Sequence, residues 1–378
     1  MKYMGSKRSM LANGLGKILR AETANANCFA DLFVGSGAVA WYIAENTCCR
    51  VRAADLQLFA VSLAEAVITR KSVVDPESVW KAWYRDALRS SRRNCLFGEA
   101  ERFDRTRWES ARRRSVDDAR EMCLGSRGPI TRAYGGHYFS PKQTLLLDAL
   151  RRTLPTDPVG RSVGLAALIC AASQCAASPG HTAQPFQPTK KGALFLFEAW
   201  RRDIASHVRS ALQRICTKHA QATGTGTVCD AETLAGQLSK GDLAFIDPPY
   251  SGVHYSRFYH VLETIAHGSC GEIEGVGRYP APKARPKSEF SIKSKSKDAL
   301  ERLLAILAER GVKAILTFPR EETSNGLSGV IVEELATRYF SCKKTIVNGR
   351  FSTLGGNLEN RKARIPAYEI ILELSPKD

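Results

Sequence analysis

The feature that most constrains the fold of this chain is a set of short apolar runs that end in glycine, aspartate or proline. Residues 27–33 lead into the glycine-rich turn at 34–37, residues 50–55 end in an aspartate, and residues 242–247 lead into Pro-Pro-Tyr. Segments with helical periodicity separate these runs. Short buried strands that alternate with helices predict an open α/β sheet with ligands at the carboxyl ends of its parallel strands.

Three further apolar runs predict additional strands, at residues 227–230, 312–318 and 368–374. Between residue 76 and about residue 220 the strand pattern gives way to helical periodicity. Residues 81–120 hold 12 basic and 7 acidic side chains, interleaved with tryptophans. Such a stretch is either a solvated helical face over an aromatic core or a surface that contacts a phosphate backbone.

Net charge narrows the class of partner. The chain has 55 Lys and Arg against 38 Asp and Glu, a net charge of +17 at pH 7, which favours nucleic acid or a membrane surface. No apolar run reaches the ~18 residues of a membrane-crossing helix, and the N-terminus lacks the apolar core of a secretory signal. The 11 cysteines form no C-x-x-C pair, so we expect reduced thiols, no metal site and a cytoplasmic setting.

The tetrapeptide Asp247-Pro248-Pro249-Tyr250, at the end of an apolar run, carries the most chemistry. An exocyclic aromatic amine is a poor nucleophile because its lone pair is delocalised into the ring. Two hydrogen-bond acceptors, the Asp247 carboxylate and the Pro248 carbonyl, would favour the tetrahedral nitrogen that can attack a methyl donor. The prolines stiffen the turn, and Tyr250 would stack on the bound base. A plain turn after a strand remains the alternative.

The glycine turn resembles a nucleoside-cofactor loop. Gly35 and Gly37 permit close backbone approach at the start of a helix, although the spacing is not that of G-x-G-x-x-G. Asp55 ends the next run and could bind both hydroxyls of a cofactor ribose. Taken alone, this pattern also fits an NAD site.

Together these features resemble the DNA adenine methylase family, in which a cofactor motif, a long insertion and a catalytic motif follow in this order. The matching segments are KYMGSKR at residues 2–8, DLFVGSG at 31–37, Asp55, Asp230 and DPPY at 247–250. The resemblance implies a Rossmann-like class I methyltransferase domain over residues 1–75 and 220–378. It also implies a mostly helical target-recognition insertion over residues 76–219.

The resemblance further implies roles for individual residues. The catalytic group is Asp247, Pro248, Pro249 and Tyr250. The S-adenosylmethionine contacts are Tyr3, Lys7, Asp31, Phe33, Gly35, Gly37, Asp55 and Asp230. Lys7 would lie near the carboxylate of the cofactor, Asp230 near its adenine, and Phe33 and Tyr250 around its sulfonium.

The sequence therefore predicts site-specific methylation of adenine N6 in duplex DNA, on a base flipped out of the stack. A cognate restriction nuclease is a candidate partner, and the enzyme would act at the nucleoid. Methylases of RNA amines and of protein glutamine use the same type of tetrapeptide and remain an alternative. A DNA-binding relative that has lost catalysis is a third.

Overall fold

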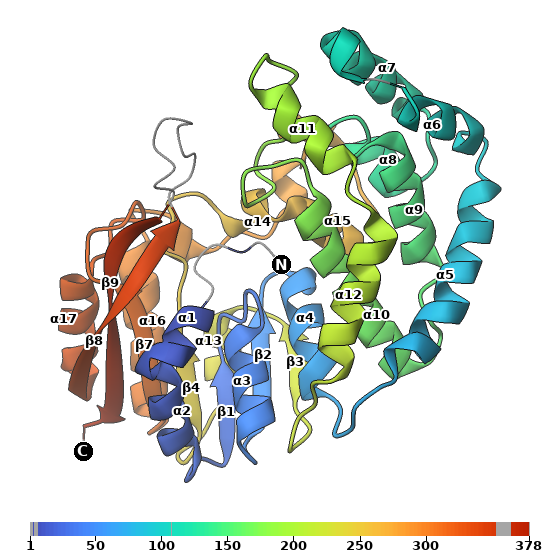
Figure 1. Ribbon diagram of the computed structural model, residues 1–378. Helices are drawn as coiled ribbons and strands as arrows, with labels where there is room; N and C mark the ends of the chain where they lie inside the picture. The colour runs from blue at the N-terminus through green and yellow to red at the C-terminus, as the bar shows by residue number, and fades with distance from the viewer. Residues whose placement is uncertain (1–2, 4–6, 107, 353–363, 378) are drawn as a thin grey trace. The chain divides into compact units, whose positions relative to one another are not determined.

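The computed structural model describes residue 3 and residues 7–106, 108–352 and 364–377 (Figure 1). The chain divides into two compact units. The sheet unit spans Met4–Ser72, Lys218–Tyr255 and Pro286–Asp378. The helical unit spans Val73–Thr217 and Ser256–Arg285 and includes Tyr3.

A seven-stranded sheet of order β3-β2-β1-β4-β7-β9-β8 organises the sheet unit. Its strands are β1 (Cys28–Asp31), β2 (Arg50–Asp55), β3 (Thr225–Val228), β4 (Leu243–Ile246), β7 (Lys313–Pro319), β8 (Phe340–Ser352) and β9 (Arg364–Pro376). The first five strands in sheet order pair in parallel, and β9 runs antiparallel to both of its neighbours. The predicted α/β class with a mostly parallel sheet is thus confirmed.

Helices cover the sheet on both faces. They are α1 (Arg8–Met10), the π-helical turn η1 (Leu11–Leu15), α2 (Gly16–Thr23), α3 (Ala38–Asn46), α4 (Leu58–Ile68), α13 (Ala231–Ala235), the 3₁₀ turn η4 (Glu289–Ser291), α16 (Ser296–Glu309) and α17 (Gly329–Tyr339). Ala244 and Ile246 of β4 belong to one buried core with α13, α16 and α17. Because side chains alternate along a strand, Leu243 and Phe245 face the opposite side, where the Phe245 ring lies 6.3 Å from that of Phe29.

The order of the strands reverses between β1 and β4. From β1 the chain moves outward through β2 to β3, and it then returns to place β4 on the other side of β1. In open α/β sheets the crevice outside the carboxyl ends of two such strands is the usual ligand site. Residues that follow β1 and β4 are therefore the first candidates for a functional site.

The structure adds a long strand that the sequence analysis does not predict. β8 pairs along its whole length with β9 and forms one edge of the sheet (Figure 1). Lys343 and Lys344 lie on this strand, and charged residues are typical of edge strands because they discourage pairing with other chains. Because polar residues interrupt the strand, it does not form an apolar run in the sequence.

The helical unit is all α apart from a two-stranded ribbon. Its elements are α5 (Pro76–Arg92), α6 (Phe97–Asp104), the 3₁₀ turn η2 (Trp108–Ala111), α7 (Arg112–Leu124), α8 (Pro129–Tyr134), α9 (Pro141–Arg152), α10 (Pro158–Cys175), α11 (Gly192–Trp200), α12 (Ile204–Cys216), α15 (His260–His267), β5 (Ile273–Glu274), β6 (Tyr279–Pro280) and the 3₁₀ turn η3 (Pro282–Ala284). The division of the chain between the two units falls within α14 (Tyr255–Phe258). In the described part of the chain, every helix is too short or too polar to cross a bilayer.

Aromatic side chains of the basic stretch lie inside the helical unit. Trp83 and Trp108 are buried, and Trp108 packs with Phe197 and Trp200 in one apolar cluster. The tryptophans therefore form core, whereas the arginines of the same helices stay exposed.

Residues 256–285 also group with this unit. There Tyr259, which directly precedes α15, and Leu262 and Ile265 of α15 are buried.

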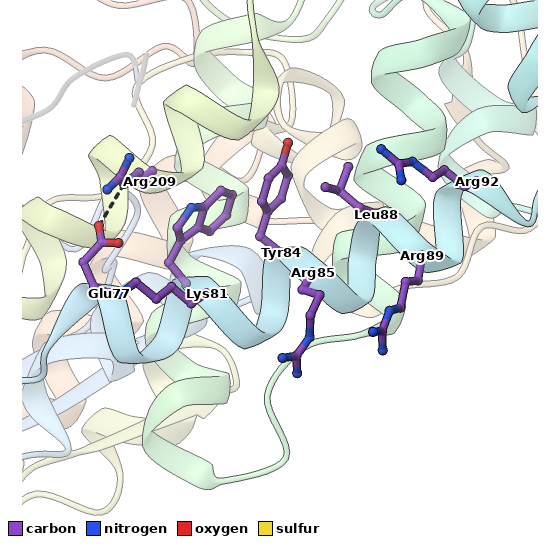
Figure 2. A pocket seen from close by; sticks show the side chains of 9 residues that line it. Glu77, Lys81, Tyr84, Arg85, Leu88, Arg89, Arg92 and Arg209 are labelled. Atoms are coloured by element: carbon purple, nitrogen blue, oxygen red, sulfur yellow. Dashed lines mark hydrogen bonds and ion pairs between the residues drawn. The ribbon is translucent and has the colours of Figure 1, made fainter.

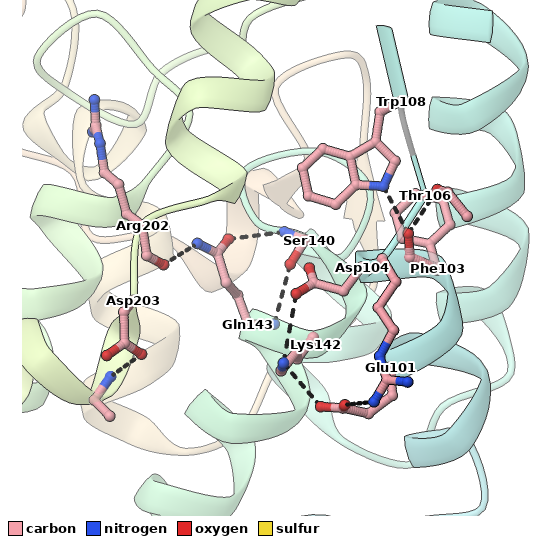
Figure 3. A network of polar contacts seen from close by, with 12 residues as sticks. Glu101, Phe103, Asp104, Thr106, Trp108, Ser140, Lys142, Gln143, Arg202 and Asp203 are labelled. Carbon is pink, nitrogen blue, oxygen red and sulfur yellow. Dashed lines mark hydrogen bonds and ion pairs between the residues drawn. The ribbon is translucent and has the colours of Figure 1, made fainter. Parts of the chain in front are cut away.

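A polar network ties α9 to the elements around it (Figure 3). Ser140 caps α9 in a capping box with Gln143, whose Nε2 also donates to the carbonyls of Ala199 and Arg202. Lys142 pairs with Glu101 at 2.9 Å and with Asp104 at 3.5 Å. Gln143 of the capping box thus also connects α9 to α11, and its neighbour Lys142 connects α9 to α6.

Asp148 of α9 provides a test of stability in the helical unit. Its buried carboxylate accepts from the backbone N–H of Ile130 (3.0 Å) and Thr131 (2.9 Å) and from the Thr131 hydroxyl (2.6 Å), at the start of α8. We expect Asp148→Ala to lower the free energy of unfolding by about 2–4 kcal/mol, because buried donors lose their acceptor. A urea titration measures this. Asp117→Ala, at an exposed site of α7, is the control, and an equal effect of both would contradict the role of Asp148.

Candidate active site

The loop after β1 contains the glycine turn and lies between the ends of the neighbouring strands. Leu32 N–H donates to Phe245 O (3.1 Å) and Val34 N–H to Ala54 O (3.1 Å). Gly35 and Gly37 have φ of 50° and 73°, a left-handed conformation that favours glycine. α3 then begins directly after Gly37. The local sequence therefore forms a tight strand-to-helix turn with its backbone close to the reversal point of the sheet.

Asp55, at the end of β2, is bonded to this turn. One carboxylate oxygen accepts from Gly35 N–H at 2.9 Å and the other from Gln57 N–H at 3.0 Å. These two bonds hold the Asp55 carboxylate beside the glycine turn. The Nε2 of Gln57 is buried without a hydrogen-bond partner among the described residues. A carboxylate and a buried amide donor are the group types that can contact the hydroxyl and acceptor groups of a nucleoside.

Asp31 ends β1 and is buried beneath the turn. Burial raises the pKa of Asp31 to about 8, and repulsion from Asp247 and Asp55 adds to this effect. The Phe33 backbone N–H donates to it at 3.4 Å and partly offsets the shift. Phe33 itself packs edge-on against Phe290, with ring centroids 5.1 Å apart.

The Asp247 turn follows β4, directly beside the glycine turn. Oδ1 of Asp247 lies 2.9 Å from Nζ of Lys7 and accepts a hydrogen bond from the Thr317 hydroxyl at 3.1 Å. Lys7 also donates to Glu369 of β9 at 2.8 Å. The buried ammonium of Lys7 is thus shared between two carboxylates, and these contacts fix the position of Asp247.

The same contacts set the charges at the site. Burial raises the pKa of Asp247, the attraction of Lys7 lowers it, and Glu369 raises it again, so that it lies at about 6. Burial lowers the pKa of Lys7, but Asp247 and Glu369 outweigh this effect and keep it above its ordinary value. Lys7 therefore stays charged, and Asp247 is mostly ionised at neutral pH.

Tyr250 closes the turn with an aromatic surface. Its ring meets that of Phe318 edge-on, with centroids 6.3 Å apart, and Nζ of Lys7 lies 5.6 Å from its centroid. Burial raises the pKa of Tyr255 well above its ordinary value, and the charges of Tyr250 and Asp247 act in the same direction. Tyr255 therefore remains neutral, and the ring of Tyr250 can present an aromatic face to a ligand.

The structure brings together most of the predicted site residues. Lys7, Asp31, Phe33, Gly35, Gly37, Asp55 and the turn Asp247, Pro248, Pro249 and Tyr250 all belong to the sheet unit, around the ends of β1, β2 and β4. The middle of the N-terminal motif, residues 4–6, lies outside the described residues.

Three predicted cofactor contacts have other partners in the structure. Tyr3 groups with the helical unit, where its ring stacks on Tyr259 at 4.6 Å. Asp230 is exposed and caps α13 by accepting from Thr233 N–H at 2.7 Å. Lys7, predicted near the cofactor carboxylate, already contacts two carboxylates of the protein.

Three residues of the site escape sequence reasoning. Thr317 and Glu369 contact the Asp247–Lys7 pair, and Asn325 donates to the Pro249 carbonyl at 2.8 Å. Thr317 and Glu369 lie on predicted strands, but only the tertiary pairing places them: β7 pairs with β4 and brings Thr317 close, and β9 pairs with β7 and brings Glu369 close. No local signal marks Asn325. In the part of the chain that the structure describes, no group of three His, Cys, Asp or Glu side chains could hold a metal.

Comparison with known proteins identifies the family. The sequence pattern of D12 class N6 adenine-specific DNA methyltransferases matches residues 3–295, which include both turns of the site. The chain belongs to this family. The resemblance to DNA adenine methylases is thereby confirmed.

One relative is the modification methylase LlaI of Lactococcus lactis subsp. lactis, which is 24% identical over 299 residues. The match covers 77% of this chain and 41% of the relative. This D12 class chain therefore spans about two fifths of the length of that relative.

The charge of Asp247 gives a pH-dependent prediction. We expect its carboxyl to ionise near pH 6, as measured by infrared difference spectra between the wild-type protein and Asp247→Asn. Because this pKa exceeds the unfolded value of about 4, the contribution of Asp247 to stability is present below about pH 4 and lost as the pH rises through 6. Ionisation at the unfolded value would contradict the burial argument.

Two substitutions separate the effect of Lys7 from a general loss of charge. Lys7→Met removes the attraction that lowers the pKa of Asp247, so ionisation should move to a higher pH. Lys17→Met, at an exposed position of α2, should leave it unchanged.

Proposed function

We propose that this chain transfers a methyl group from S-adenosylmethionine to the N6 amine of adenine in duplex DNA. The observation that carries the proposal is the pairing of β1 with β4, which sets the glycine turn and the Asp247 turn side by side. A cofactor loop and an acceptor pair for an amine are thus neighbours at one edge of the sheet. Membership of the D12 class supports the same chemistry.

Asp247 accepts a hydrogen from the target amine in this proposal. Its Oδ1 is taken by Lys7 and Thr317, which, among the residues that the structure describes, leaves Oδ2 for the substrate. The Pro248 carbonyl is the second acceptor, and together they favour a tetrahedral nitrogen. Because the contacts of Asp247 are already made in the free protein, little reorganisation is needed at the moment of transfer.

The proposed cofactor contacts follow from the glycine turn. Asp55 would accept from the ribose hydroxyls, and Gly35 and Gly37 would allow the turn to approach the cofactor closely. Phe33 and Tyr250 would provide the aromatic surroundings that suit a sulfonium whose charge disappears on transfer. S-adenosylmethionine supplies the methyl group as this electrophilic sulfonium. Tyr3 and Asp230 remain proposed contacts by family resemblance alone.

The helical unit, predicted as a target-recognition insertion over residues 76–219, offers a surface for the DNA backbone. A groove of about 440 Å³ runs along α5 (Figure 2). The residues that line it are Glu77, Trp80, Lys81, Tyr84, Arg85, Leu88, Arg89, Arg92 and Arg209. A second depression, of about 630 Å³, shares Arg89 and adds Arg93 and Arg152. Several cations thus line both depressions along the helix.

The spacing of these cations suits a row of phosphates. Lys81, Arg85 and Arg89 recur every fourth residue, about 6 Å apart along the axis. Arg85 and Arg89 are 62% and 69% exposed, and one acid, Asp86, lies near both. Like charges at this spacing destabilise an isolated helix, and a polyanion would relieve that repulsion.

A cognate nuclease and a nucleoid location remain predictions of the sequence.

The first experiment measures methyl transfer from labelled S-adenosylmethionine to unmethylated genomic DNA, with total RNA in parallel. We expect N6-methyladenine in DNA. Asp247→Ala should lower kcat at least about 100-fold because one of two fixed acceptors is lost, with cofactor affinity changed less than about threefold. Asp242→Ala, just before the same strand, is the control. Retained turnover in Asp247→Ala, or label in RNA instead of DNA, would contradict the proposal.

A second experiment tests the α5 surface through salt. Each lost phosphate contact lowers the slope of log affinity against log salt by about 0.9. Replacing Arg85, Arg89 and Arg92 together by Gln should therefore lower this slope by about 2 to 3 in filter-binding titrations. The control replaces three exposed cations of the sheet unit, Lys17, Arg20 and Lys71, by Gln. Equal slopes for both triple variants would refute the α5 assignment.

A further inference from the structure

A fully buried asparagine lies behind the Asp247 turn, in the loop between β7 and α17. Asn325 is 0% exposed. Its Nδ2 donates to Pro249 O at 2.8 Å and to Phe290 O at 2.9 Å. Its Oδ1 accepts from the Thr323 hydroxyl at 2.6 Å and from Leu327 N–H at 3.2 Å. Both amide hydrogens and the carbonyl oxygen are therefore in use.

The surrounding loop fixes the position of this side chain. Gly326 N–H donates to Thr323 O at 2.9 Å and Thr323 N–H to Leu327 O at 2.8 Å, which closes a tight turn around Asn325. Gly326 adopts φ 86°, a conformation that favours glycine. The Ser296 hydroxyl of α16 donates to the backbone carbonyl of Asn325 at 2.8 Å. The amide therefore has little freedom to reorient.

Asn325 connects both halves of the candidate active site. Through Pro249 O it holds the peptide that joins Pro249 to Tyr250, and the neighbouring Ser324 hydroxyl accepts from Gly252 N–H at 2.9 Å. Through Phe290 O it holds the turn η4, whose Phe290 ring packs against Phe33 of the glycine turn. One side chain thus fixes the backbone of the amine-binding turn and the aromatic contact of the cofactor loop.

We propose that Asn325 is a positioning residue for methyl transfer, acting through the Pro249 carbonyl to orient the Pro248 carbonyl and the Tyr250 ring. This proposal rests on the proposed function. A rotation of the Pro249–Tyr250 peptide would move an acceptor and a stacking surface together. Misplacement by about 1 Å can cost about 10²-fold in rate. The loss falls on the transfer step, whereas the groups that hold the cofactor, such as Asp55, keep their own hydrogen bonds.

The chemistry of the site selects this residue type. Two buried carbonyls need two donors, and a hydroxyl and an N–H need an acceptor. A primary amide offers all of these at once. A carboxylate has the same shape but cannot donate while ionised, so it would leave Pro249 O and Phe290 O without a donor.

The test uses the full chain in single-turnover methyl transfer from labelled S-adenosylmethionine to unmethylated genomic DNA. Asn325→Asp and Asn325→Ala should slow the transfer step at least about 30-fold, with cofactor affinity within about threefold of the wild type. Leu307→Ala, a buried position of α16 outside these contacts, is the control for lost stability and should retain the wild-type rate below its unfolding temperature. This split between rate and affinity would not follow from a purely structural role.

Several results would overturn the proposal. A rate within threefold of wild type in both Asn325 variants does so, as does an equal slowing by Leu307→Ala. If neither Asn325 variant folds, Ser324→Ala decides, because it removes the bond to Gly252 from a surface position; we expect a three- to tenfold slower transfer, and an unchanged rate refutes the role of the loop. Absence of transfer by the wild-type chain overturns the proposed function and this inference together.

Discussion

Parallel pairing of β1 with β4 is the constraint on which the rest of the site depends. These strands lie more than 200 residues apart in the sequence, yet Asp31 stands opposite Phe245 in their register. A shift of register by two residues would separate the glycine turn from the Asp247 turn by about 7 Å. Leu32 N–H continues the ladder to Phe245 O past the end of β1. The backbone hydrogen bonds of the sheet thus fix the distance between the glycine turn and the Asp247 turn.

Three aspartate side chains lie close together at the carboxyl ends of the strands, and their mutual repulsion influences the charges at the site. Asp31, Asp55 and Asp247 lie close enough for Asp31 to respond to both of the others. Three different arrangements accommodate them. Burial favours the protonated form of Asp31, backbone N–H groups bond Asp55, and Lys7 balances Asp247 together with Glu369. Asp247 is mostly ionised at neutral pH, and the proposed function assigns its second oxygen to the target amine.

In the helical unit the same helices carry core aromatics and surface cations. On α5, Trp80 and Trp83 meet edge-on inside the unit, with ring centroids 6.0 Å apart, while Arg85 and Arg89 extend into solvent. Both interpretations of the basic stretch, an aromatic core and a phosphate-binding surface, are therefore compatible, because they concern opposite faces of one helix.

The sequence by itself determined the α/β class, the two turns with their glycines and prolines, and the helical character of residues 76–219. Each of these follows from local periodicity and from the conformational limits of Gly and Pro. Family resemblance added Lys7 as a predicted cofactor contact, and in the structure Lys7 lies beside Asp247. These features depend on residues close together in the sequence or on short sequence motifs.

Only the tertiary structure decided which residues support those turns. Glu369 reaches Lys7 because β9 runs antiparallel to β7, and Thr317 reaches Asp247 because β7 pairs with β4. Asn325 reaches Pro249 from a loop with no motif. Likewise, Asp230 caps a helix and Tyr3 stacks on Tyr259. Such contacts join residues far apart in the chain, and their identity depends on strand order and register, which local pattern does not encode.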